Sequence, residues 1–265
     1  MAIDVAVLLS IGRHPASGRS RRADCDARAL ELALRLGETV RLHAIHAGDP
    51  NEPALADYLG MGLASLTVLS QPAGADVLPA LVEHLAGLKP ALVLTGGTAE
   101  TGEGSGLLPY LIARTLGAAL LPAIAELSLA GNAIAALQAL PRGRRRRLTA
   151  PLPCVATVDH AASAARQSAF APARRGRVDV IDLPAGPLFL GDAREIPARA
   201  KPKRLKIVTG ISAADRLRAA TEIQAGRGQL IVHPPADKAA ETIFEYLVDE
   251  GILAAPALVD PRAKD

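Results

Sequence analysis

Short apolar runs alternate with amphipathic stretches through the first part of the chain. The runs Ile3–Leu9, Val40–Ile45, Leu66–Leu69 and Ala91–Leu94 have the length of buried parallel strands. Apolar residues at helical spacing lie between and after them, in a first segment that Asp24 or Asp26 is expected to cap and in segments that begin at Glu52, at Asp76 and at Leu107. Ser10–Arg22, between the first run and the first helix, is expected to be a mobile basic loop. This alternation predicts an α/β fold with a doubly wound, mainly parallel sheet.

The pattern changes after Leu116. Four further strands are predicted at Leu120–Leu129, Ile134–Leu140, Arg145–Thr149 and Cys154–Val158, with turns between them. The chain becomes rich in Pro, Arg and Lys from Pro184, which is typical of a linker. We therefore predict a domain over residues 1–183 and a C-terminal arm over 184–265. The arm would contain a strand at Leu205–Thr209 and helices at Ala213–Gly226 and Ala236–Glu250.

A glycine-rich segment, Gly96–Gly106, follows the fourth apolar run and precedes an amphipathic helix. A strand, a glycine loop and a helix N-terminus in succession favour binding of an anionic group by backbone N–H donors. The segment is not a Walker A loop and lacks the G-x-G-x-x-G spacing. The alternative is a turn that binds no ligand. Glu100 and Glu103 would repel a phosphate, so we expect them to face outward or to accept hydrogen bonds from ribose hydroxyls.

Composition excludes several classes of function. Aromatic residues make up 2% of the chain and Trp is absent, which argues against single-stranded nucleic-acid binding. The Arg144–Arg147 run would then be a solvated strand edge that discourages aggregation, with phosphate binding as the alternative. We see neither a signal peptide nor an apolar run that could span a membrane, and we expect a soluble, cytoplasmic protein.

Sequence spacing offers no catalytic or metal-binding constellation. Cys25 and Cys154 lack metal or redox spacing, and the six histidines are scattered. No nucleophile motif is visible, so we expect no metal, no catalytic residues and no enzymatic activity.

Four stretches in order resemble the β subunit of electron transfer flavoprotein, with a likeness that runs from about residue 3 to residue 182. They are Asp24–Leu36, Tyr58–Ala64, Leu94–Gly106 and Leu152–Thr157. Such a likeness implies an adenine-nucleotide-binding, Rossmann-like domain that binds AMP, with FAD shared with a partner α subunit. It also implies cofactor contacts by a set of residues at the ends of the strands: Ala6, Ala23, Asp24, Cys25, Asp26, Ala47, Gly96, Gly97, Thr98, Ala99, Gly102, Glu103, Gly104, Ser105 and Gly106.

The chain departs from that family at Cys25, where an aromatic residue near the flavin ring is common, and at Gly97 and Thr98, where Lys and Gln are usual. These departures suggest a divergent branch, similar to β subunits associated with the breakdown of N-methylated glycine. Members of that family bind their partner dehydrogenases through a loop that corresponds to residues 166–177 of this chain. Phe170 would be the apolar anchor, surrounded by the basic residues Arg166, Arg174, Arg175 and Arg177.

The sequence therefore predicts an electron carrier. Electrons would pass from flavin-dependent dehydrogenases to a quinone-linked oxidoreductase, and the C-terminal segment would embrace the α subunit. The alternatives are a nucleotide-binding domain of the universal-stress or ATP-pyrophosphatase kind, and a structural subunit with an empty pocket. The pyrophosphatase is disfavoured because Ser10-Ile11-Gly12-Arg13 replaces its S-G-G-x-D-S loop.

Overall fold

The structure is a computed structural model that describes residues 2–102, 104–187, 212–214, 217, 231–249 and 252–253. The chain divides into two units, Met1–Glu195 and Ile196–Asp265, and each is described by itself. None of the described helices is long and apolar enough to cross a membrane.

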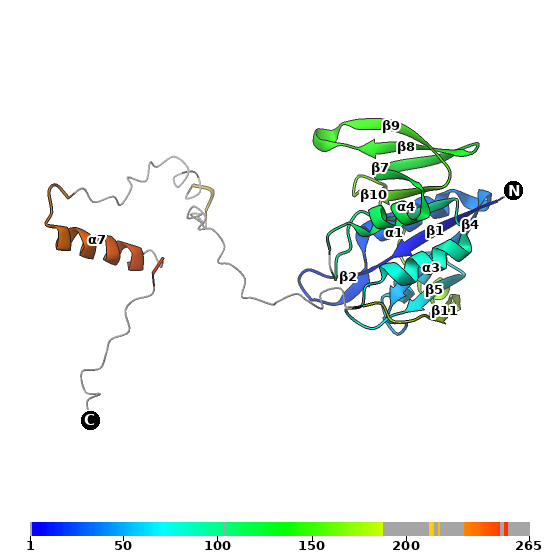
Figure 1. Ribbon diagram of the computed structural model, residues 1–265, viewed down its shortest axis with the longest axis horizontal. Helices are drawn as coiled ribbons and strands as arrows, with labels where there is room; N and C mark the ends of the chain where they lie inside the picture. Colours follow the sequence, from blue (N-terminus) through cyan, green and yellow to red (C-terminus); the bar gives the residue numbers. More distant parts are fainter. Residues whose placement is uncertain are drawn as a thin grey trace, which may run out of the picture. The chain divides into compact units, whose positions relative to one another are not determined.

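Within the described part of the first unit, nine strands form one sheet in the order β11-β5-β4-β1-β6-β10-β7-β8-β9 (Figure 1). Their bounds are β1 Ile3–Leu9, β4 Val40–Gly48, β5 Ser65–Ser70, β6 Leu92–Gly96, β7 Ala119–Ala130, β8 Ala133–Ala139, β9 Arg145–Pro151, β10 Cys154–Val158 and β11 Arg177–Asp182. All pairings from β11 to β7 are parallel, whereas β8 and β9 pair in antiparallel fashion. The mainly parallel α/β sheet predicted from the sequence is confirmed.

Helices cover both faces of this sheet. The helices of the first unit are α1 Asp24–Arg35, α2 Leu55–Leu59, α3 Leu78–Leu88, α4 Leu108–Leu116 and α5 Phe170–Arg175, with short 3₁₀ turns at Gly37–Thr39 and Pro141–Gly143. Successive strand side chains point to opposite faces. In β1, Val5 and Val7 belong to the core that contains α1 and α2 residues, while Ala6 and Leu8 belong to the core that contains α3 and α4 residues.

Three local predictions were wrong. The segment Ser10–Arg22, expected to be a mobile loop, contains the antiparallel pair β2 (Ile11–Arg13) and β3 (Ser20–Arg22). Helix α1 has Ala23 at its N-cap, and neither Asp24 nor Asp26 caps it, because both lie inside its first turn. The segment expected to be a docking loop includes α5 and leads into β11, a strand that the sequence reasoning missed.

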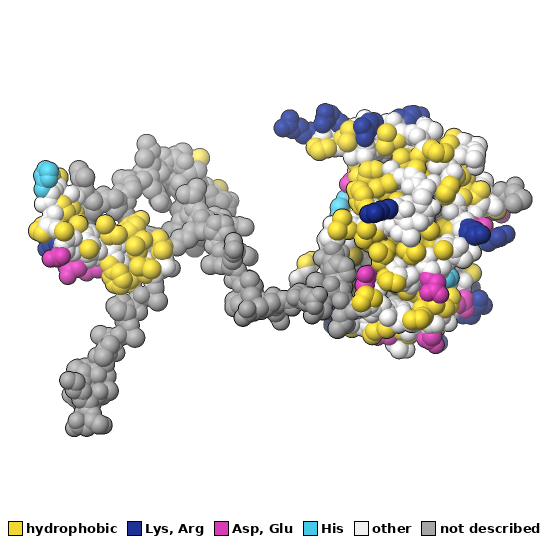
Figure 2. Space-filling model, in the orientation of Figure 1, with side chains coloured by type: hydrophobic (Ala, Val, Ile, Leu, Met, Phe, Trp, Pro, Cys, Tyr) yellow, Lys and Arg dark blue, Asp and Glu magenta, His cyan; other side chains and the backbone are white. Residues whose placement is uncertain are grey.

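β9 is an edge strand of the sheet, and its Arg145, Arg146 and Arg147 are exposed. Figure 2 shows Lys and Arg side chains gathered at the end of the first unit that β7, β8 and β9 form. Arg146 donates two hydrogen bonds to the Gln138 side-chain oxygen of the neighbouring strand β8. Charged side chains on a free edge hinder pairing with another chain, as the sequence analysis proposed.

The described part of the second unit contains the helix α7, Ala236–Asp249 (Figure 1). This helix confirms the prediction for Ala236–Glu250 to within one residue. The strand predicted at Leu205–Thr209 lies outside the described residues, and of Ala213–Gly226 only residues 213, 214 and 217 are described. Ile243, Phe244 and Tyr246 are exposed apolar residues on α7.

Candidate functional site

A cleft of about 1100 Å³ lies at the carboxyl ends of the parallel strands β1, β4, β5 and β6. In open α/β sheets this is the edge at which ligands bind. The glycine-rich segment that follows β6 forms one wall, and the segment that follows β4 forms another. Of the described residues that line the cleft, none is Lys or Arg. An anion in this cleft would therefore be held by backbone N–H groups and by helix dipoles rather than by side-chain cations.

Most of the predicted cofactor-binding residues lie at this cleft. The lining includes Asp26, Ala47, Gly96, Gly97, Thr98, Ala99, Gly102, Gly104 and Gly106. Ala6 is completely buried within β1 and Ala23 is buried at the start of α1, so neither offers a side chain to the cleft. Ser105 is exposed, and its hydroxyl oxygen accepts a hydrogen bond from the Leu107 N–H at 3.1 Å. Glu103 lies outside the described residues.

The glycines are required by contact as well as by backbone conformation. Gly106 has a φ of +75°, and a Cβ there would lie 2.9 Å from the Gly97 carbonyl oxygen. A Cβ on Gly96 would lie 2.4 Å from Asp26 Oδ1. Larger residues would therefore displace the loop from the wall of the cleft, whereas a Cβ on Gly97 would have nothing within 4 Å.

Asp26 joins three elements beneath the cleft. Its side chain accepts hydrogen bonds from the Ser10 N–H and hydroxyl, just after β1, and from the Gly96 N–H at the end of β6. The residue is 4% exposed. Burial raises the pKa of Asp26 to about 6, although the hydrogen bonds from Ser10 and Gly96 act to lower it. The carboxyl group thus fixes the spacing of the β1 and β6 ends.

Replacing Asp26 by Ala is expected to lower the unfolding free energy by about 2–3 kcal/mol at pH 5, because the buried Gly96 N–H and the partly buried Ser10 N–H lose their acceptor. The folded pKa is raised above the unfolded value of 3.8. This group therefore favours folding most at low pH, and its contribution falls as the pH rises from about 4 through about 6.

Denaturant titrations at several pH values test this expectation for Asp26. The variant should lose the part of the pH dependence that lies between about pH 4 and pH 6. Glu38→Ala is the matched control, because Glu38 is exposed in a 3₁₀ turn. An Asp26→Ala protein with the parental pH profile would contradict the role assigned to this carboxyl.

Tyr58 supports the same region from α2 and was not singled out in the sequence. Its side chain is fully buried, and its hydroxyl donates to the Ser10 carbonyl and accepts from the Ala23 N–H, both at 2.8 Å. It therefore joins the end of β1 to the start of α1. In the sequence, Tyr58 lies among apolar residues of a short helix, and nothing near it indicates that its hydroxyl binds Ser10 and Ala23.

Glu100 faces α1 and is not among the residues that line the cleft. Its carboxylate accepts hydrogen bonds from the Asp24 N–H at 3.0 Å and from Arg21 at 2.8 Å. The Thr101 hydroxyl donates to the Ile11 carbonyl oxygen. These contacts attach the glycine-rich segment to the β2–β3 hairpin. Glu100 also provides an acceptor for the Asp24 N–H, one of the first N–H groups of α1, which have no acceptor within the helix.

His46, at the end of β4, is buried on the cleft wall. Its Nδ1 lies 2.8 Å from the Leu9 carbonyl oxygen, an acceptor, so Nδ1 is assigned the hydrogen. Burial lowers the pKa of His46, and the ring is neutral at pH 7 with Nε2 as an acceptor.

Helix α5 is attached to α2, and its first residue, Phe170, is exposed. The Ala169 N–H donates to the Gly60 carbonyl, and Gly176 lies close to Leu59, so α5 is fixed to α2 at both ends. Phe170 is 82% exposed. Arg174 and Arg175 are exposed in the last turn of α5.

Arg166 differs from Arg174 and Arg175 because it forms an ion pair with Glu31 of α1, 2.7 Å away. Arg177 also forms an ion pair, with Asp179 of its own strand β11. Burial acts to raise the pKa of Glu31, but hydrogen bonds from Arg166 and Arg35 outweigh it and lower the pKa to about 2. Arg166 therefore attaches the segment before α5 to the body of the unit.

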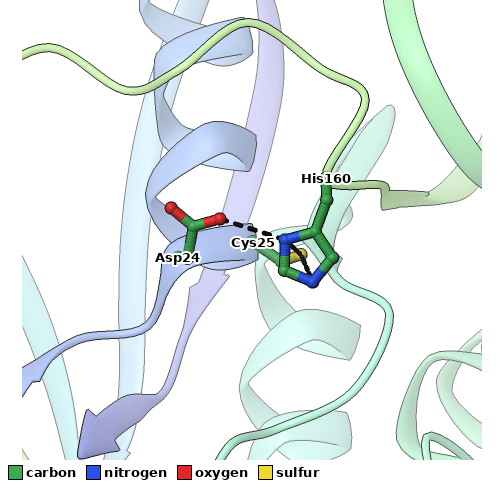
Figure 3. A group of neighbouring side chains, drawn as sticks. All are labelled: Asp24, Cys25 and His160. Carbon is green, nitrogen blue, oxygen red and sulfur yellow. Dashed lines mark hydrogen bonds and ion pairs between the residues drawn. The ribbon is translucent and has the colours of Figure 1, made fainter. Parts of the chain in front are cut away.

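The structure also brings together three residues that the sequence analysis left apart. Asp24 and Cys25 on α1 lie beside His160, just after β10 (Figure 3). Because 135 positions separate Cys25 from His160, no spacing rule could have linked them.

The fold and the cleft define this chain as a Rossmann-like α/β protein with a ligand cleft at the carboxyl edge of its sheet. The model of the electron transfer flavoprotein domain matches residues 17–186. The chain is also 50% identical, over 262 residues, to the electron transfer flavoprotein subunit beta of Chromohalobacter salexigens, covering 95% of this chain and 96% of that relative. The chain belongs to the electron transfer flavoprotein family, whose role is electron transfer.

Proposed function

We propose that this chain binds AMP in the cleft and, together with an α subunit, holds FAD. In this proposal it carries electrons from flavin-dependent dehydrogenases, including those of N-methylglycine-type substrates, to a quinone-linked oxidoreductase. The observation that supports AMP most directly is a cleft walled by a glycine-rich segment at the carboxyl edge of the sheet. Family membership supports the electron-carrier role and the pairing with an α subunit.

The cleft fits an adenine nucleotide in size and chemistry. Its volume of about 1100 Å³ is ample for a small nucleotide. Backbone N–H groups of the glycine-rich segment can approach a phosphate closely because the glycines lack side chains. Asp26 and Glu100 have their carboxylates engaged with protein donors, so neither is directed at the phosphate. Apolar residues such as Leu78 and Leu107 can pack against a purine ring.

The described part of the chain offers little to a complete flavin. FAD supplies one- and two-electron chemistry when it is bound, and the protein supplies orientation and electrostatics. Of the Phe and Tyr residues that the structure describes, none is among the residues that line the cleft. This supports the proposed division, in which a second chain encloses most of the ring system.

Co-expression tests this division of labour. Purified alone, the chain should be colourless and should release about one equivalent of AMP on denaturation. Purified with its α subunit, it should be yellow and contain both AMP and FAD. A yellow single chain would contradict the shared flavin site, and hydrolysis of ATP by the isolated chain would favour the universal-stress or pyrophosphatase alternative. Nucleotide is identified by chromatography and flavin by its absorption spectrum.

A further inference from the structure

The two ring nitrogens of His46, on the wall of the cleft, have different surroundings. The residue is 5% exposed, and its Nδ1–H donates to the Leu9 carbonyl oxygen at 2.8 Å. Its Nε2 has no hydrogen-bond partner within the described part of the chain. Because no described side-chain nitrogen or oxygen is both fully buried and without a partner, Nε2 must retain access to the cleft that His46 lines.

Gly48, the last residue of β4, keeps the space beside Nε2 clear. A Cβ at this position would lie 2.6 Å from His46 Nε2 and 3.2 Å from its Cε1. A larger residue would therefore cover the nitrogen. Gly48 also lines the cleft, so the uncovered nitrogen faces the cleft where the strand ends.

The Nε2 atom is a hydrogen-bond acceptor. Because the Leu9 carbonyl requires a hydrogen on Nδ1, the neutral ring carries none on Nε2. Burial lowers the pKa of His46, although the Leu9 hydrogen bond and the carboxylates of Glu52 and Asp49 act to raise it. The ring is therefore neutral near pH 7, and a ligand would contact Nε2 through a donor group.

The distance between His46 and the glycine-rich segment determines which part of a nucleotide reaches this acceptor. β1 lies between β4 and β6, so the ends of β4 and β6 are about 10 Å apart at the usual spacing of neighbouring strands. A phosphate bound by the glycine-rich segment would have its ribose close by and its base at the far end of the molecule. Adenine carries a donor amino group at its 6-position, whereas guanine carries an acceptor oxygen there.

We propose that His46 Nε2 accepts a hydrogen bond from the 6-amino group of adenine and thereby selects adenine over other purines. This inference rests on the proposed binding of AMP and adds the residue that recognises the base. The Leu9 carbonyl fixes the ring, and Gly48 leaves Nε2 uncovered. A site built to bind a donor group rejects an analogue that lacks it, because the acceptor in the site is then left unpaired.

Competition between AMP and purine riboside 5′-monophosphate, which lacks only the amino group, tests the proposal. Isotope-labelled AMP is exchanged into the purified full-length chain, and each unlabelled nucleotide is added as a competitor. The parent chain should prefer AMP at least about tenfold, which corresponds to about 1.4 kcal/mol of binding free energy. In His46→Asn the side-chain amide can still donate to Leu9, but no acceptor reaches the position of Nε2. This variant should bind the two nucleotides about equally.

His43→Asn is the matched control, because His43 lies on the same strand but does not line the cleft. Its preference for AMP should equal that of the parent chain. If His46→Asn weakened the binding of both nucleotides to the same extent, or if the parent bound both equally, the proposal would be overturned. 2′-Deoxy-AMP is the third competitor, and a preference that His46→Asn removes against this nucleotide alone would assign the contact to the ribose and overturn the assignment to the base. A parent chain that takes up no labelled AMP would contradict the proposed AMP binding itself, and this inference with it.

Discussion

Gly106→Val is expected to remove AMP from the protein while leaving the sheet folded. Gly106 has a φ of +75°, where a non-glycine residue costs about 1–2 kcal/mol, and a side chain would also press on the Gly97 carbonyl and the Thr98 hydroxyl. The glycine-rich segment would have to shift from the wall of the cleft. Because each 1.4 kcal/mol is a factor of ten, nucleotide affinity should fall at least about tenfold.

The measurement is AMP released per chain after denaturation, together with a melting curve. Gly97→Ala is the matched control, since a Cβ at that position meets nothing within 4 Å and Gly97 does not have a positive φ. The control should retain AMP at the parental level. If Gly106→Val still contained one equivalent of AMP, the glycine-rich segment would not be the phosphate-binding wall.

Much of the sheet could be predicted because buried parallel strands carry a strong local signal. β1 has the predicted bounds, and β10 was also predicted correctly, since both are mostly apolar and largely buried. β11 was missed because Arg177–Asp182 is a half-exposed edge strand with charged residues between its apolar ones. Its position beside β5 comes from a parallel pairing with a strand more than 100 residues earlier in the chain. The sequence of residues 177–182 does not indicate that this segment pairs with β5.

Some features of the candidate site could likewise be predicted from the sequence, and others could not. The glycine-rich segment could be identified because its composition and its place between a strand and a helix are local features. The roles of Asp26, Glu100 and His46 could not, because each depends on contacts with residues distant in the chain. Asp26 was interpreted as a candidate helix cap, yet its carboxylate binds Ser10 and Gly96 instead. The polar side chains of these residues indicated that they need hydrogen-bond partners, but the sequence did not indicate which residues those partners are.

Phe170→Ala is expected to slow reduction of the heterodimer by its partner dehydrogenase without loss of stability. We propose that α5 is the docking element and that Phe170 is its anchor, as the family resemblance implies. Truncation of an interface anchor typically costs about 2 kcal/mol or more, which corresponds to roughly a 30-fold weaker complex. Arg174 and Arg175 would mainly steer an acidic partner, so their contribution to the association rate should diminish with salt.

The exposure of the Phe170 side chain distinguishes a docking role from a role in core packing. Phe170 is 82% exposed, and truncation of such a side chain should change the unfolding free energy by less than about 0.5 kcal/mol, against about 3–5 kcal/mol for a core Phe. Val180→Ala is the matched control, because Val180 is an exposed apolar residue on the neighbouring strand β11. The measurements are a dehydrogenase-coupled reduction rate and a melting curve for each variant. A large drop in the melting temperature of Phe170→Ala would assign the ring to packing, and an unchanged reduction rate would place the docking surface elsewhere on the protein.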